Sequence, residues 1–144
     1  MHATVRSVIE AAAGSDDDVC ILDTEASPEH LSRGTAQYAE TMLIVVEPYY
    51  KSLETGRRMA LLGADLGIPT VALVGNKVRD EREAEAIRQF AGKHSIDIAG
   101  FVPFDDALPA SERAQQAPLD YAPDGPAVAA ISGIGRELAR NGRA

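Results

Sequence analysis

Residues 42–74, MLIVVEPYYKSLETGRRMALLGADLGIPTVALV, decide the fold of this chain. Two short apolar runs, at 42–46 and 70–74, flank a stretch from Ser52 to Leu66 whose apolar residues recur at helical spacing. Gly67 follows that stretch as a helix stop signal. A strand, a helix and a second strand in this order predict a parallel strand pair joined by a crossover helix.

Apolar and amphipathic segments alternate in the same way on both sides of this unit. Val19–Leu22 and Ile96–Val102 are further apolar runs, and Glu81–His94 is an amphipathic stretch with acidic residues in its first turn. Most of the runs are too continuous for a strand with one wet face, so we expect burial on both faces. The sequence therefore predicts an α/β fold: a partial doubly wound parallel sheet of about four strands, flanked by helices in a Rossmann-like three-layer arrangement.

The composition of the sequence changes after the last apolar run. Prolines recur from 103 to 126, which indicates a Pro-rich loop region, and residues 127–140 are again amphipathic. Gly133 and Gly135 weaken this last helix by about 1 kcal/mol each relative to alanine, so it should depend on docking to the sheet. We expect residues 1–144 to form one domain that ends in this docking helix.

Composition excludes several classes of function. The 144 residues carry 14 Lys and Arg against 22 Asp and Glu, a net charge of -8 that repels a nucleic-acid backbone. A single cysteine, Cys20, supplies neither a disulfide framework nor a zinc ribbon. No apolar run approaches the roughly 20 residues of a membrane span, so we expect a cytoplasmic protein without a membrane span.

Chemistry is expected just after the apolar runs, because ligands bind beyond the carboxyl ends of the strands in a parallel α/β sheet. Asp23 follows the first run and offers a hard oxygen at the sheet edge. It either holds a divalent ion or its bound waters, or it merely caps the next segment. The position of Asp23 in the sequence does not favour either interpretation over the other.

Asn76 and Lys77 follow the third run and suit a purine. The amide offers a donor and an acceptor together, and the lysine stem packs over a ring. A guanine site would need a carboxylate near the third position after Asn76, where Arg79 has only donors. Adenine is therefore favoured over guanine if a base binds.

Several motifs in order resemble one family. The motif residues are Asp23–Ala26 with Glu29 and His30, Arg33–Thr35, Val45–Pro48, Ser52–Arg58 and Gly75–Arg79. As a set they closely resemble the CooC-type accessory ATPases of carbon monoxide dehydrogenase maturation, within the MinD/ArsA/ParA group of P-loop ATPases. The resemblance covers nearly the whole chain but only the C-terminal part of the family's domain, so residues 1–144 would be a partial domain.

The resemblance implies roles for residues at the sheet edge. Asp23, Thr24, Glu25 and Glu29 would belong to switch II, with Asp23 on Mg²⁺ through water. The base side of ATP or ADP would be contacted by Asn76, Lys77, Arg79, Val102, Pro103 and Phe104. Ser27 stands where the family usually has glycine, which weakens the case for γ-phosphate sensing. The partner implied is a nickel enzyme that the ATPase would help to mature as a metallochaperone.

The phosphate-binding loop is the main departure from the family. No G-x-x-x-x-G-K-[ST] element, nor the family's lysine-rich variant, occurs in the 144 residues. We therefore expect weak or absent binding of ATP, ADP and Mg²⁺ and no hydrolysis by this chain alone. In the family the strand that carries this loop lies inside the sheet, so its absence leaves strand edges open for pairing.

Two hypotheses about function follow. The chain is either the C-terminal portion of a nucleotide-switched ATPase that acts with an N-terminal half encoded elsewhere or lost by truncation, or a non-catalytic interaction module. Such a module would dock on a full-length relative or self-associate through open strand edges.

Overall fold

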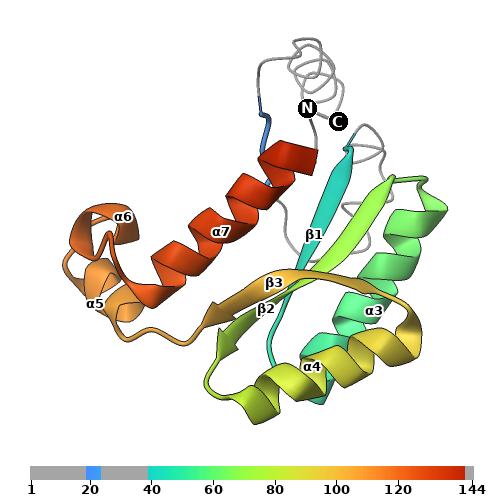
Figure 1. Ribbon diagram of the computed structural model, residues 1–144, viewed down its shortest axis with the longest axis horizontal. Helices are drawn as coiled ribbons and strands as arrows, with labels where there is room; N and C mark the ends of the chain where they lie inside the picture. The colour runs from blue at the N-terminus through green and yellow to red at the C-terminus, as the bar shows by residue number, and fades with distance from the viewer. Residues whose placement is uncertain (1–18, 24–38, 142–144) are drawn as a thin grey trace.

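The computed structural model describes residues 19–23 and 39–141 of the chain (Figure 1). The elements, in order, are β1 (Thr41–Val46), α3 (Tyr50–Asp65), β2 (Thr70–Val78), α4 (Glu81–His94), β3 (Asp97–Pro103), α5 (Ala107–Arg113), α6 (Pro118–Tyr121) and α7 (Pro126–Asn141).

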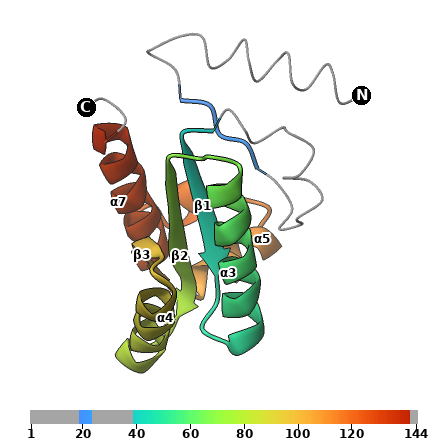
Figure 2. The same ribbon diagram turned by 90° about the vertical axis from the view of Figure 1, so that its right-hand side faces the viewer.

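The three strands form one parallel sheet in the order β1-β2-β3. The helices α3 and α4 cover one face of this sheet, and α7 covers part of the other (Figure 2). These three layers confirm the predicted α/β fold with a parallel sheet flanked by helices.

The helix boundaries follow local signals in the sequence. The N-cap of α4 is Asp80, whose Oδ1 accepts a hydrogen bond from the Glu83 N–H at 2.8 Å, and Ser95 ends the helix in a left-handed conformation. The predicted bounds Glu81–His94 are confirmed. Gly67 lies just after α3 with φ of +76°, as its stop signal predicts.

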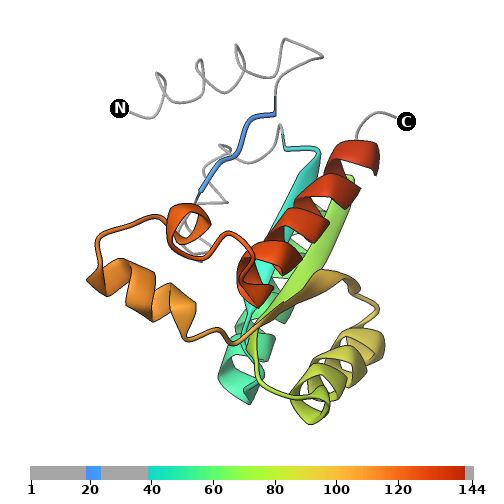
Figure 3. The same cartoon turned by 60° about the vertical axis from the view of Figure 1, so that its left-hand side comes forward.

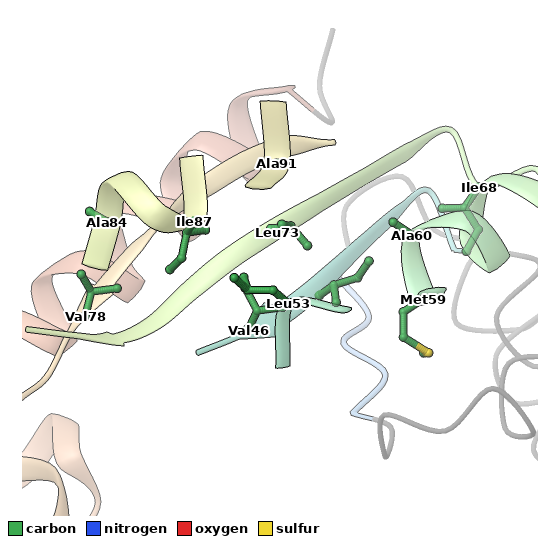
Figure 4. Close-up of a cluster of buried hydrophobic side chains, with 11 residues drawn as sticks. Val46, Leu53, Met59, Ala60, Ile68, Leu73, Val78, Ala84, Ile87 and Ala91 are labelled. Atoms are coloured by element: carbon green, nitrogen blue, oxygen red, sulfur yellow. The ribbon is translucent and has the colours of Figure 1, made fainter. Parts of the chain in front are cut away.

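The main core lies between the sheet and the α3–α4 layer (Figure 4). Its buried members are Ile44, Val46, Leu53, Met59, Ala60, Ile68, Leu73, Val78, Ala84, Ile87 and Ala91. Leu73 of the central strand and Ile87 of α4 are both 0% exposed, so each packs against protein on all sides. Burial of this apolar surface is the largest favourable term in folding.

A smaller apolar cluster lies on the opposite face of the sheet, under α7. It is formed by Val74, Val102 and Ala127, with Ile134 of α7 packed against it. α7 therefore packs on the sheet, but Ile131, which the helical pattern also places on the docking face, is 54% exposed. α7 packs mainly on β3. Figure 3 shows α7, in red, on this face of the sheet.

The Pro-rich region from 103 to 126 also contains two short helices, α5 and α6, which the proline pattern did not predict. Asp105 connects this region to α7. Its Oδ1 accepts from the Ala107 N–H at 2.9 Å and its Oδ2 accepts from the Ala127 N–H at 3.3 Å. One carboxylate therefore holds the first turns of α5 and α7 together.

Two expectations about strands are wrong in detail. Val19–Leu22 forms no strand: residues 19–23 have no regular structure, and Ile21 is 86% exposed. A strand is stable only when a neighbour satisfies its backbone groups, and none of the described segments pairs with this run. The sheet in the described residues therefore has three strands, not four.

The prediction that both faces of each strand are buried is also wrong for β1. Ile44 and Val46 lie under α3, but Leu43 and Val45, which alternate with them, are 37% and 62% exposed. Within residues 19–23 and 39–141, β1 pairs only with β2. The strand edge away from β2, which we call the open edge of β1, therefore presents backbone groups that pair with no strand in these residues, and the face opposite α3 exposes Leu43 and Val45.

Candidate functional site

The candidate site lies at the carboxyl ends of the three strands, where β2 ends in a bulge. Gly75 is opposite Phe101, but Val78 is opposite Pro103, so three steps along β2 match two along β3. Asn76 and Lys77 occupy the irregular step, and Lys77 has a left-handed φ of 55°. The sequence placed these residues in a loop after the strand, whereas the strand continues to Val78.

The bulge brings Lys77 to the end of the neighbouring strand. Its Nζ donates a hydrogen bond to Glu47 Oε1 at 2.8 Å, which links residues 30 positions apart. Glu47 is itself held in place, because its backbone N–H donates to Ser52 Oγ in the first turn of α3 at 2.9 Å. The hydrogen bond to Glu47, aided by the negative charge of that carboxylate, raises the pKa of Lys77.

Arg79 and Phe104 meet across the ends of β2 and β3. The Arg79 guanidinium lies over the Phe104 ring, 4.5 Å from its centroid. Backbone contacts hold both residues: the Phe104 N–H donates to the Val78 carbonyl oxygen at 2.9 Å, and the Arg79 N–H donates to Glu83 Oε2 at 2.7 Å. Phe104 is 38% exposed and so presents part of its ring to solvent.

A hollow of about 330 Å³ opens beside this pair. Its lining residues are Val78, Arg79, Asp80, Glu81, Ala84, Arg88, Phe101 and Pro103. The sequence did not single out Arg88 and Phe101, although the Arg88 guanidinium lies 5.0 Å from the Phe101 ring centroid. The i,i+3 spacing of Glu85 and Arg88 predicts their salt bridge, at 3.3 Å, but not the ring that Arg88 covers.

Of the predicted base-side residues, the structure brings five to this edge: Asn76, Lys77, Arg79, Pro103 and Phe104. Val102 lies elsewhere: it is 4% exposed and belongs to the cluster under α7. Its side chain is therefore buried against α7 and is not available to contact a ligand at the edge.

The predicted switch II residues lie mostly outside the described residues. Thr24, Glu25 and Glu29 fall in the range 24–38, and only Asp23 is described, as an exposed residue without regular structure. Within residues 19–23 and 39–141, no group of three His, Cys, Asp or Glu side chains could hold a metal ion. The described residues alone therefore supply no complete Mg²⁺ site.

Sequence comparison relates the chain to ATP-binding proteins. It is 42% identical over 97 residues to an uncharacterized ATP-binding protein of Methanocaldococcus jannaschii, covering 67% of this chain and 37% of that protein. It is 32% identical over 122 residues to the carbon monoxide dehydrogenase accessory protein CooC of Rhodospirillum rubrum, covering 85% of this chain and 46% of CooC. The chain thus spans less than half the length of these relatives. No protein-family model matches the sequence.

Comparison with solved structures finds proteins of similar fold. The chain matches the MinD cell division protein of Aquifex aeolicus with a TM-score of 0.61 and 20% identity, over 72% of this chain and 45% of MinD. It matches a ParA family ATPase of Chlorobium tepidum with a TM-score of 0.56 and 22% identity, over 67% and 40% of the two chains. At these identities the matches establish the fold alone.

In the described part of the chain, no helix combines the length and the apolar character needed to cross a bilayer. The chain is thus related in sequence to CooC and another ATP-binding protein, over less than half the length of each, and it shares the fold of MinD and a ParA family ATPase.

Proposed function

We propose that the carboxyl edge of the sheet is the base side of an adenine-nucleotide site in a CooC-type ATPase. The observation that carries this proposal is the placement of Asn76, Lys77, Arg79 and Phe104 at one edge of the sheet. The similarity to ATP-binding relatives supports it.

The chemistry of this edge suits an adenine ring. The Asn76 amide has a donor and an acceptor for the edge of the base, and the Lys77 stem offers apolar surface to its face. The Arg79 guanidinium covers one face of the Phe104 ring, and the 38% of Phe104 that is exposed would offer aromatic surface to the base. Arg79 has no acceptor to meet the ring donors of guanine, so adenine is the expected base.

The phosphate side must come from elsewhere. The 144 residues contain no glycine-rich phosphate loop, and their net charge of -8 opposes a triphosphate. In our proposal, residues outside this sequence provide the loop and the Mg²⁺ site. Asp23 would then face the magnesium side, and the complete ATPase would act in the cytoplasm in maturation of a nickel enzyme.

Adenosine and ATP are expected to bind the 144-residue chain with similar dissociation constants, within about threefold. The reason is that base contacts are present and phosphate contacts are absent. Titration of the two ligands, monitored by amide chemical shifts in NMR spectra, measures both constants, and phosphate release measures hydrolysis. ATP binding 100-fold tighter than adenosine, or ATP turnover, would contradict the proposal.

A non-catalytic interaction module is the second candidate function. The open edge of β1, with Leu43 and Val45 exposed, favours it, because such an edge pairs readily with another strand. In this case the partner would be a full-length relative or a second copy of the chain.

Val45→Lys is expected to abolish any self-association through this edge, because a lysine on an edge strand blocks pairing with a further strand. Light scattering over a concentration series measures the mass. Leu61→Lys on α3 is the matched control, since Leu61 is 55% exposed and lies beside His94 and Ile96. A dimer that survives Val45→Lys but not Leu61→Lys would place the interface on α3 instead.

A further inference from the structure

Lys77 is held in an unusual way for a lysine near a nucleotide site. Its left-handed backbone in the β2 bulge directs the side chain across to β1, where Nζ meets Glu47 Oε1 at 2.8 Å. Left-handed backbone is uncommon for a residue with a long side chain, and such conformations persist where the surroundings hold them. Here the surroundings include the ion pair and the anchored backbone of Glu47.

The ion pair removes a positive charge from the edge. The Lys77 and Glu47 side chains keep 54% and 33% of their exposure, so the pair lies where a ligand would approach. Arg79, which directly follows β2, lies against the Phe104 ring. A phosphate arriving here therefore meets a neutralised lysine on a protein that carries a net charge of -8.

We propose that Glu47 is a specificity-determining residue: by pairing with Lys77 it makes the carboxyl edge select an uncharged base over a phosphate. The lysine stem then remains available as apolar surface, while its charge is already satisfied. The part of this inference that concerns adenine rests on the proposed base site. The part that concerns phosphate depends only on the ion pair between Lys77 and Glu47.

The test compares Glu47→Gln with the unchanged chain, using three probes: adenosine, ATP and inorganic tripolyphosphate. Glutamine keeps the shape and an oxygen that can accept from Lys77, but it leaves the lysine charge unbalanced. At an ionic strength of about 10 mM we expect ATP and tripolyphosphate to bind about threefold to tenfold more tightly, with adenosine unchanged. The gain should vanish in about 0.5 M NaCl, where surface charges are screened.

Two further variants make the result specific. Glu40→Gln changes the net charge equally but precedes β1, at the other end of the strand, and it should not improve anion binding. Glu47→Gln combined with Lys77→Met removes the freed charge and should cancel the gain. The inference is overturned if Glu40→Gln acts like Glu47→Gln, if the double variant keeps the gain, or if adenosine binding falls as well.

The two proposals can fail separately. If adenosine does not bind the unchanged chain, the base site is wrong, but tripolyphosphate still decides whether Glu47 restrains Lys77. If adenosine binds and Glu47→Gln leaves tripolyphosphate and ATP unaffected, the base site stands and the role of Glu47 is wrong.

Discussion

Leu73→Ala is expected to lower the free energy of unfolding by about 3–5 kcal/mol, the largest loss that we predict for a single truncation in this chain. Leu73 is in the central strand and is 0% exposed. The change removes its transfer energy and leaves a cavity between the sheet and the α3–α4 layer, which neighbours can fill only in part. Urea unfolding followed by circular dichroism measures the loss.

Leu61→Ala is the matched control for this prediction. It makes the same chemical change on α3, at a side chain that is 55% exposed, and should change stability by about 0.5 kcal/mol or less. Domains of this size have a total stability of only about 5–15 kcal/mol, so Leu73→Ala should shift the urea midpoint strongly. Equal midpoints for the two variants would mean that Leu73 is not in the core.

Local signals explain why much of the fold could be predicted from the sequence. The stop signal at Gly67 and the apolar periodicity of Glu81–His94 act within one or two turns of chain, so their effects do not depend on distant residues. The strands at 41–46 and 97–103 also agree with their apolar runs to within a residue. In these segments local preference and tertiary packing favour the same structure.

The failures have a different origin. Val19–Leu22 has the composition of a buried strand, but a strand also needs a neighbour, and composition does not report whether one is present. The same reason explains β1, whose five apolar residues 42–46 predict two buried faces although α7 covers only β3 and its surroundings. Whether a strand has a partner, and whether a helix covers its face, depends on residues that are distant in the sequence.

The sequence was sufficient to predict which residues form the candidate site, but not how their side chains are arranged. Asn76, Lys77 and Arg79 could be identified from the run of polar residues after an apolar strand. The pairing of Lys77 with Glu47 could not, because it depends on the bulge that turns the lysine toward β1. Arg88 and Phe101 were missed for a similar reason, since their contact joins an exposed helix face to a strand whose register is set by β2.

The second large expected change in stability arises at Gly56, where α3 approaches the sheet closely. A Cβ added at Gly56 would lie 2.5 Å from Val46 Cγ1, and Val46 is 1% exposed on a strand beneath the helix. Valine is stiff at χ1 and cannot move this methyl away without shifting β1. We therefore expect α3 to be displaced from the sheet by any larger residue at position 56.

Gly56→Leu should lower the free energy of unfolding by about 3 kcal/mol, because overpacking of a tight contact outweighs the better helix propensity of leucine. Gly92→Leu in α4 is the control: nothing lies within 4 Å of a Cβ at Gly92, which is exposed, so the same change should stabilise the chain by up to about 1 kcal/mol. Thermal and urea unfolding of the two variants measure these opposite shifts. If both variants were stabilised, α3 would not lie against β1 through Gly56, and the packing that positions Glu47 and Ser52 beside Lys77 would have to be revised.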